Sequence, residues 1–285
     1  MLRVGYLVMP SVAVFPNSCA LNSAPVMSAA ISALQKHGFT VSENCMNSDI
    51  AMIWSVLWAG RMAPNQHIYE HYRQQGRPVI ILEVGSLLRN TTWKVCLNNI
   101  NAQGFFGHCT DLDLDRPKKL GITLGKSQRQ GDHVLVALQH EQSLQLKGVD
   151  YPDWIANTLK KLRAVTDRAC LLRPHPRSRL DITRFGLEIN LPKKIAQTYD
   201  SFDIDYQCHA VINYNSGVGV QAALSGTRVC VDNSSLAREV AVDLDQIDSN
   251  IEPDRAQWLI EICHTEWLRE EIEQGIWVKR LGLHS

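Results

Sequence analysis

Short apolar runs alternate with longer stretches of mixed polarity along the first half of the chain. The apolar runs predict strands and the mixed stretches predict helices, with strands at residues 4–9, 39–42, 50–56 and 78–84 and helices at residues 25–37 and 66–75. Residues 10–22 contain two prolines and small polar residues and are expected to form a loop. The alternation predicts a parallel sheet with helices on both of its faces.

The second half shows the same alternation after a less regular region at residues 85–130, which glycines interrupt. Here the pattern predicts strands at residues 133–138, 170–172, 210–212 and 229–231 and helices at residues 152–162, 219–224 and 252–275. We therefore expect an α/β protein with two domains, residues 1–128 and 129–285, joined by a linker near residues 126–132.

Polar residues follow the predicted strand 210–212 at the point where the next helix begins. Asn215, Ser216 and Gly217 form a turn there, and Gly226 ends the helix. Free backbone N–H groups and the positive end of the helix dipole would meet at this turn, which suits a phosphate group. The alternative is an ordinary crossover in which Ser216 only caps the helix.

A second group of polar residues follows the strand 170–172, in the segment RPHPR. Arg173, His175 and Arg177 are separated by prolines, which keep this segment out of a helix. Open α/β sheets bind ligands at the carboxyl ends of their strands, and arginine has the planar fork that matches phosphate. An exposed basic loop is the alternative.

RPHPR followed by NSGVGVQAALSGTRVCV resembles the donor half of glycosyltransferases with the GT-B architecture, over roughly residues 131–240. The resemblance is to capsular-polysaccharide-type transferases and to phage-encoded DNA-modifying glycosyltransferases. It implies two Rossmann-like domains facing a cleft, a final helix that returns to the first domain, and a nucleotide-sugar donor, a UDP-sugar above others. The implied donor-binding residues are Gln139, Arg173, His175, Arg177, Asn215, Ser216, Gly217 and Gln221. Gln221 and Thr227 stand where glutamate and proline are common, which leaves the contact to the donor ribose open.

The first half combines aromatic and cationic residues that suit sugar stacking or unstacked bases with phosphates. They are expected to bind the acceptor and comprise Trp58, Arg61, Asn65, Arg89, Trp93 and Lys94. Most of these residues lie in the segments WSVLWAGRMAPN (54–65) and LLRNTTWKV (87–95). Together with the strands before them, these segments also resemble phage-encoded glycosyltransferase-like proteins, some of which modify hydroxymethylated bases in phage DNA. The resemblance implies a hydroxymethylpyrimidine in DNA as the acceptor, with a capsule or other glycan as the alternative. Trp54 and Trp58 could equally be core residues, and for Trp54 we favour the core.

Sugar transfer needs a neutralised leaving group and, commonly, a base for the acceptor hydroxyl. Glu83 ends an apolar strand and precedes a glycine, so it is the candidate catalytic base, although a structural carboxylate would fit the same position. The histidines at 37, 67, 71 and 108 look like surface or helix residues. Two Asp-x-Asp patterns, at residues 111–113 and 203–205, lie in polar segments, so we expect no metal site and no essential cofactor.

Charge and cysteine content refine this interpretation. The net charge is zero, but residues 1–130 carry 12 lysines and arginines against 7 acidic residues, while the remainder carries 17 against 22. A basic first half could face a polyanion such as DNA. Eight scattered cysteines without a C-x-x-C pair, and the absence of a long apolar run, favour a cytoplasmic protein with reduced thiols and no membrane contact. The rival functions are a sugar-nucleotide epimerase of the same shape and a non-catalytic nucleotide- or glycan-binding protein.

Overall fold

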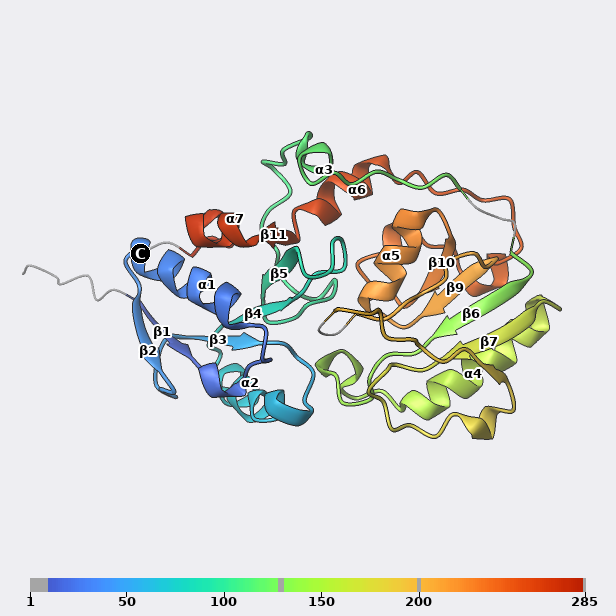
Figure 1. The fold of residues 1–285 in the computed structure, drawn as a ribbon, viewed down its shortest axis with the longest axis horizontal. Coiled ribbons are helices and arrows are strands. Elements are labelled where there is room, and N and C mark those ends of the chain that lie inside the picture. The colour runs from blue at the N-terminus through green and yellow to red at the C-terminus, as the bar shows by residue number, and fades with distance from the viewer. Residues whose placement is uncertain (1–9, 128–130, 199–200, 284–285) are drawn as a thin grey trace, which may run out of the picture.

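The chain folds into two α/β halves that lie side by side (Figure 1). The computed structural model describes residues 10–127, 131–198 and 201–283. The strand expected at residues 4–9 and the middle of the expected linker lie outside the described residues. The predicted domain boundary near residue 128 stays a proposal. It falls between β5, Thr92–Leu97, in the first sheet and β6, His133–Ala137, in the second.

The first sheet has six strands within the described residues, in the order β11-β5-β4-β3-β1-β2. Their bounds are β1 Ser11–Val14, β2 Thr40–Glu43, β3 Ile50–Trp54, β4 Val79–Val84, β5 Thr92–Leu97 and β11 Glu266–Leu268. β1 to β4 pair in parallel, whereas β5 runs antiparallel to β4 and to β11. The edge strand β11 comes from the C-terminal part of the chain, so that part returns to the first half.

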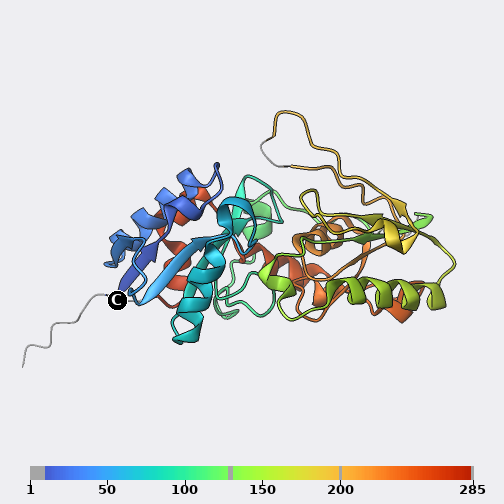
Figure 2. The ribbon, with the colours of Figure 1, turned by 90° about the horizontal axis from the view of Figure 1, so that it is seen from below.

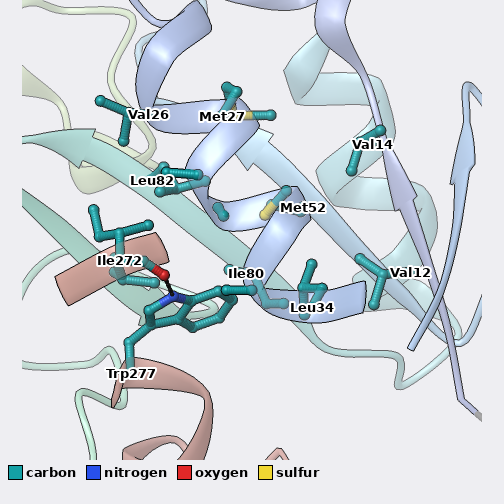
Figure 3. Packing of buried hydrophobic residues seen from close by; sticks show 14 of the residues in the cluster. Val12, Val14, Val26, Met27, Leu34, Met52, Ile80, Leu82, Ile272 and Trp277 are labelled. Carbon is teal, nitrogen blue, oxygen red and sulfur yellow. Dashed lines mark hydrogen bonds between the residues drawn. The ribbon is translucent and has the colours of Figure 1, made fainter. Parts of the chain in front are cut away.

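Both faces of this sheet are buried, because alternate residues of each strand enter different cores. On β3, Met52 and Trp54 face one core while Ala51 and Ile53 face the other. Helix α2, Asn65–Gln74, covers the second face. The first face is covered by three helices, α1 Ala24–Lys36, α7 Arg269–Gln274 and α8 Ile276–Arg280. Figure 3 shows this core, in which the indole of Trp277 donates a 3.0 Å hydrogen bond to the backbone oxygen of Ile272.

The second sheet is parallel throughout its described strands, which follow the order β10-β9-β6-β7-β8. Their bounds are β6 His133–Ala137, β7 Ala169–Arg173, β8 Glu188–Ile189, β9 Ala210–Asn213 and β10 Arg228–Val231. Helix α4, Tyr151–Val165, packs on one face, and α5 Gly217–Ser225 and α6 Ala256–Cys263 pack on the other. Between β8 and β9 the chain leaves the sheet in a long excursion, which Figure 2 shows rising above the rest of this half.

The single helix expected at residues 252–275 is wrong, because this stretch crosses between the two halves. Trp258 and Ile262 on α6 enter the core of the second half, whereas Trp267 on β11 enters the core of the first. One continuous helix could not reach both cores. The chain instead leaves α6, pairs as β11 with β5, and continues as α7 against α1 (Figure 1). The segment thus reaches the first half as a strand and a short helix, and not as the one long helix expected.

Two other expectations need correction. The stretch 10–22, expected to be a loop, contains strand β1, and the irregular region 85–130 contains strand β5 and the short helix α3, Arg116–Lys119. β5 escapes notice because its inward positions include Thr92 and Lys94, whose burial depends on a partner distant in sequence. All eight cysteines lie in the described ranges without a disulfide, and six of them are buried, whereas Cys45 is half-buried and Cys109 is exposed. None of the described helices has the length and apolar character needed to cross a membrane.

Residues 252–275, which cross between the two halves, are called the crossing segment below. A buried histidine on this segment makes the stability of the fold depend on pH. His264 is held as the neutral tautomer, since Nδ1 donates to the oxygen of Ile260 at 2.7 Å and Nε2 accepts from the N–H of Asp113 at 3.0 Å. Burial lowers the pKa of His264, and Arg280 and Arg116 act in the same direction. The unfolded chain therefore takes up a proton near pH 6.5 that the folded protein binds only at lower pH, and acid favours unfolding.

We expect the melting temperature to fall between about pH 7.5 and about pH 5.5, and to fall less in the His264→Gln protein. The variant removes one site of proton uptake on unfolding while the other buried histidines remain. Thermal denaturation of both proteins at each pH measures the difference. An equal fall in the two proteins would contradict the assignment.

Candidate functional site

A cavity of about 770 Å³ lies between the two halves. Its walls are formed at the carboxyl ends of β3 and β4 on one side and of β6, β7 and β9 on the other. The size is typical of a site for a small organic molecule. The parallel strands of both sheets thus present their carboxyl ends to the same space.

The start of α5 forms one part of the second-half wall, through Ser216 and Gly217. The Ser216 hydroxyl accepts a 3.0 Å hydrogen bond from the Asn213 side chain, whose own oxygen accepts from the Ser216 N–H at 2.8 Å. No side chain caps α5. The alternative in which Ser216 only caps the helix is therefore not what the geometry shows, and the helix N-terminus faces the cavity with its dipole uncompensated by a cap.

The side chains of Gln139 and Asn215 hold the start of α5 in place through hydrogen bonds. Gln139 Nε2 donates to Asn215 Oδ1 at 3.1 Å, and the Asn215 N–H donates to Gln139 Oε1 at 3.2 Å. Gln139 lines the cavity, but Asn215 does not, and its amide also donates to Ser234 Oγ at 2.8 Å. Asn215 therefore supports the turn instead of facing a ligand.

The basic turn after β7 forms the adjoining part of the wall, as the sequence predicts for Arg173, His175 and Arg177. Arg173 is buried and its guanidinium donates to the backbone oxygen of Asp203. Burial lowers the pKa of Arg173, but an arginine in a protein stays cationic. The turn thus brings guanidinium groups to the same cavity as the start of α5.

A second histidine, His140, joins the turn and was not predicted. Its ring lies 5.2 Å from the ring of His175, centroid to centroid. In each ring Nδ1 accepts a backbone N–H, from Gln142 at 3.1 Å and from Arg177 at 3.2 Å, so Nε2 carries the proton of the neutral form. Burial lowers the pKa of His140. The pair can donate N–H groups to an anionic ligand.

Glu141 connects β6 to the basic turn and was likewise missed. It accepts from Ser178 Oγ at 2.6 Å and from the Arg179 N–H at 3.1 Å. Burial alone would raise the pKa of Glu141, but these hydrogen bonds outweigh it and hold the pKa below its ordinary value. The signal for both missed residues is their position, immediately after a predicted strand, where only Gln139 was assigned.

Gln221 lies on α5, one turn into the helix, and also lines the cavity. Its side-chain oxygen accepts a 2.8 Å hydrogen bond from the hydroxyl of Tyr206. Burial raises the pKa of Tyr206, so this phenol stays protonated and remains a donor. Gln221 is therefore held in one orientation, with its amide as the group that can face a ligand.

On the first-half wall, Glu83 lies at the carboxyl end of β4 and faces the cavity. Its Oε2 accepts a 2.7 Å hydrogen bond from Ser55 Oγ, and its Oε1 accepts from the Val84 N–H at 2.8 Å. Ser55 follows β3 with φ of 66°, a left-handed conformation that is unusual for serine. A strained residue that orients a carboxylate in a cavity is a recurrent feature of functional sites.

We expect Ser55→Ala and Ser55→Gly to slow the reaction in which Glu83 is the candidate base by similar factors, about tenfold, because both remove a hydrogen bond to the charged Glu83. Their stabilities should differ, because glycine relieves the left-handed strain by roughly 1–2 kcal/mol relative to alanine. Turnover and chemical denaturation measured on both proteins separate the two effects. Activity that simply followed stability would contradict a role for the hydroxyl.

The predicted acceptor residues are only partly brought together. Arg61, Arg89 and Lys94 line the cavity. Arg61 Nε donates to the oxygen of Cys19 at 3.3 Å, and Arg89 lies in the loop after β4. Lys94 is buried, and its ammonium lies 3.0 Å from the carboxylate of the buried Glu266, so its charge is neutralised within the protein.

Three further predicted residues do not line the cavity, for identifiable reasons. Trp58 packs against Tyr69, with ring centroids 5.8 Å apart. Asn65 is fully buried and its amide donates to the backbone oxygen of Trp54 at 2.6 Å. Trp93 packs against the core of the first face. The expected acceptor contacts of these three residues stay a prediction that the cavity lining does not support. Trp54 belongs to the buried core, as favoured from the sequence, and also lines the cavity.

The described residues contain no group of three or more histidine, cysteine, aspartate or glutamate side chains suited to a metal ion. In the two Asp-x-Asp patterns, Asp113 forms an exposed ion pair with Lys119 at 2.6 Å, and Asp203 accepts from the Lys193 N–H at 2.7 Å. Both patterns thus serve local structure. The expectation that activity needs no metal stays a prediction, to be tested by experiment.

No protein-family model matches the chain, and no curated protein sequence matches it. The solved structures similar to it include two of KpsC from Thermosulfurimonas dismutans. The KpsC β-Kdo 2,7-transferase superimposes with a TM-score of 0.53 over 96% of this chain and 99% of that one, at 13% identity. The KpsC β-Kdo 2,4-transferase gives a TM-score of 0.50 over 90% of each chain, at 12% identity. These likenesses confirm the expected fold, two Rossmann-like domains facing a cleft.

Proposed function

We propose that the protein is a glycosyltransferase that moves a sugar from a nucleotide-sugar donor to an acceptor hydroxyl. The observation that carries this proposal is the division of the cavity wall. Arg173, His175, Arg177 and the α5 N-terminus lie on one side, and Glu83 held by Ser55 lies on the other. A cationic wall suits a leaving phosphate, and a carboxylate opposite suits a base for the incoming hydroxyl.

The donor is assigned to the second half. Guanidinium forks, imidazole N–H groups and helix-terminal amides are groups that bind phosphate oxygens, and here they meet at the ends of neighbouring strands. We propose a UDP-sugar as co-substrate and expect transfer without an added metal, because the cationic groups can neutralise the leaving diphosphate themselves. The similar KpsC structures are Kdo transferases by name, which supports sugar transfer on this fold.

The acceptor proposed from the sequence is a hydroxymethylated pyrimidine in DNA, based on the basic first half and the resemblance to phage-encoded enzymes. A glycan hydroxyl is the second candidate, and two observations favour it. Lys94, one of the cations expected to contact DNA phosphates, is neutralised by Glu266. The similar solved structures are named as Kdo transferases. The two candidates differ sharply in their response to salt.

If the acceptor is DNA, its binding should weaken steeply as salt rises, since phosphate contacts release counterions. Arg61→Glu should then reduce this slope, whereas Lys118→Glu, an exposed charge reversal outside the cavity wall, should change it little. Binding titrations at several salt concentrations measure both slopes. Salt-independent affinity, or binding to glycans alone, would select the glycan acceptor.

The function itself is tested in two steps. A thermal-shift screen of nucleotide sugars identifies the donor, and the purified protein is then assayed for slow release of nucleoside diphosphate and for transfer to hydroxymethylated DNA and to glycans. A transferase should release the diphosphate and accelerate on addition of its acceptor. Stabilisation by a nucleotide sugar without any turnover would instead indicate a non-catalytic binding protein.

A further inference from the structure

The crossing segment places a carboxylate deep inside the first half, next to Lys94, which is in turn the ladder partner of Glu83 between β4 and β5. Glu266 on β11 is 1% exposed. It accepts hydrogen bonds from the N–H groups of Ser86 and Leu87 at 2.6 and 3.0 Å, from Thr92 Oγ1 at 2.7 Å and from Lys94 Nζ at 3.0 Å. The loop after β4 is thus wrapped around this carboxylate.

The wrapping is close enough to restrict the loop sequence. A Cβ atom on Gly85 would lie 2.4 Å from Glu266 Oε2 and 2.3 Å from the backbone oxygen of Thr92. Lys94 also donates to the hydroxyl of Ser86. The backbone and side chain of Ser86 are therefore both fixed by the ion pair.

The same loop, residues 85–90, contacts the second half at two points. At one end, Ser86 lies against the start of α5, where a Cβ on Gly217 would come within 2.9 Å of Ser86 Cβ and Oγ. At the other end, Asn90 Nδ2 donates a 3.0 Å hydrogen bond to Ser201 Oγ, on the excursion between β8 and β9. Residues on both sides of these contacts line the cavity.

Stability alone gives little reason for this arrangement. A buried ion pair is often no more stabilising than apolar residues of the same volume, because both charges must be desolvated. Glu266 stays ionised, since the effects of Lys94, Thr92 and the loop N–H groups outweigh a burial that would raise its pKa. What the pair does achieve is a fixed geometry for a loop that lines the cavity.

We propose that Glu266 is a positioning residue that holds the loop 85–90 against α5 and Ser201, so that the crossing segment determines how the two halves close over the cavity. The proposal deepens the proposed function by assigning control of its site to β11, yet the contacts that it concerns exist without turnover. Any movement that separates the halves must break the loop contacts or carry the loop away from Glu266.

Hydrogen exchange on Glu266→Gln tests this directly, without reference to catalysis. Glutamine keeps the shape but replaces one acceptor oxygen by an NH₂ group, which cannot accept from the loop. Ser86 and Leu87 donate to different oxygens of Glu266, so the one of these two amides that meets the NH₂ group should exchange roughly 10- to 100-fold faster, the effect of losing a hydrogen bond to a charged group, while β3 and β4 amides keep their rates. The start of α5 should gain exchange as its contact with Ser86 loosens.

The matched control is Glu271→Gln, on the same C-terminal segment. Glu271 pairs with the buried Arg116 at 2.8 Å and makes no bond to the loop 85–90. Faster exchange at Ser86 or Leu87 in both variants would reflect general destabilisation and overturn the proposal. Unchanged exchange in a folded Glu266→Gln protein would overturn it as well.

Glu266→Gln could fail to fold because it leaves the buried Lys94 ammonium without a counter-ion. In that case the double variant Lys94→Met with Glu266→Gln, which removes both charges, is measured in its place, with the same expected exchange. Activity adds an independent readout where turnover is found. Transfer should fall at least tenfold in kcat/KM for the acceptor, while the Kd for the nucleotide, held by the second half, changes less than threefold. An equal loss in both would contradict positioning.

Discussion

Glu83→Gln is expected to slow sugar transfer by roughly 10²- to 10⁴-fold, the contribution of a positioned general base. The carboxylate lies in the cavity wall opposite the cationic turn, with one oxygen held by Ser55. Glutamine keeps the volume and can still accept from Ser55, but it cannot take a proton from the acceptor hydroxyl. The loss should therefore fall on the chemical step.

Donor binding should barely change, because the groups assigned to the donor lie on the second half. Single-turnover transfer, nucleotide affinity and melting temperature measured on one preparation separate this outcome from a structural role. A structural Glu83 would lower the melting temperature, and activity would fall only in proportion to unfolded protein. Glu141→Gln is the matched control: this second cavity carboxylate holds the basic turn through Ser178, so its loss should weaken nucleotide binding more than it slows transfer.

A well-folded Glu83→Gln protein with near-normal turnover would exclude the base assignment. It would favour a retaining reaction, in which the leaving phosphate assists the acceptor hydroxyl and no such carboxylate is needed. The same measurement therefore bears on stereochemistry. Analysis of the anomeric configuration of the product would complete the distinction.

The parts of the site that follow β4, β7 and β9 could be predicted because their signal is local. Each strand is an apolar run buried on both faces, and the first polar residues after it lie at the carboxyl edge of a parallel sheet. Glu83, Arg173 and Ser216 all reach the cavity for this reason. The same rule applied to β3 and β6 would have found Ser55 and His140.

The parts that escaped prediction depend on contacts distant in sequence. Lys94 and Glu266 are separated by 172 residues, and each is buried only because the other is present. A charged residue in a strand pattern argues against burial, so neither β5 nor β11 could be found locally. Trp258 and Trp267 resemble one apolar helical stripe, and only the tertiary structure shows that they enter different cores.

Arg173→Ala and Arg177→Ala are each expected to weaken nucleoside-diphosphate binding by about 1.5–3 kcal/mol, or roughly 10- to 100-fold, since each removes a charge-assisted hydrogen bond. Both residues line the cavity on the rigid turn after β7. Arg173→Lys keeps the charge but loses the planar fork, so it should recover only part of the affinity.

Calorimetric titration with UDP measures these effects, and thermal denaturation shows whether each variant is folded. This check of folding matters most for the Arg173 variants, because Arg173 is buried and donates a hydrogen bond to the Asp203 backbone. Arg184→Ala provides the control: this guanidinium lies 5.0 Å from the ring centroid of Phe185, in the same half but outside the cavity wall, and its loss should leave UDP affinity unchanged. Equal affinity in the wild type and in both Arg173→Ala and Arg177→Ala would move the diphosphate away from this turn. The α5 N-terminus and His140, which follows β6, would then be the groups left to bind it.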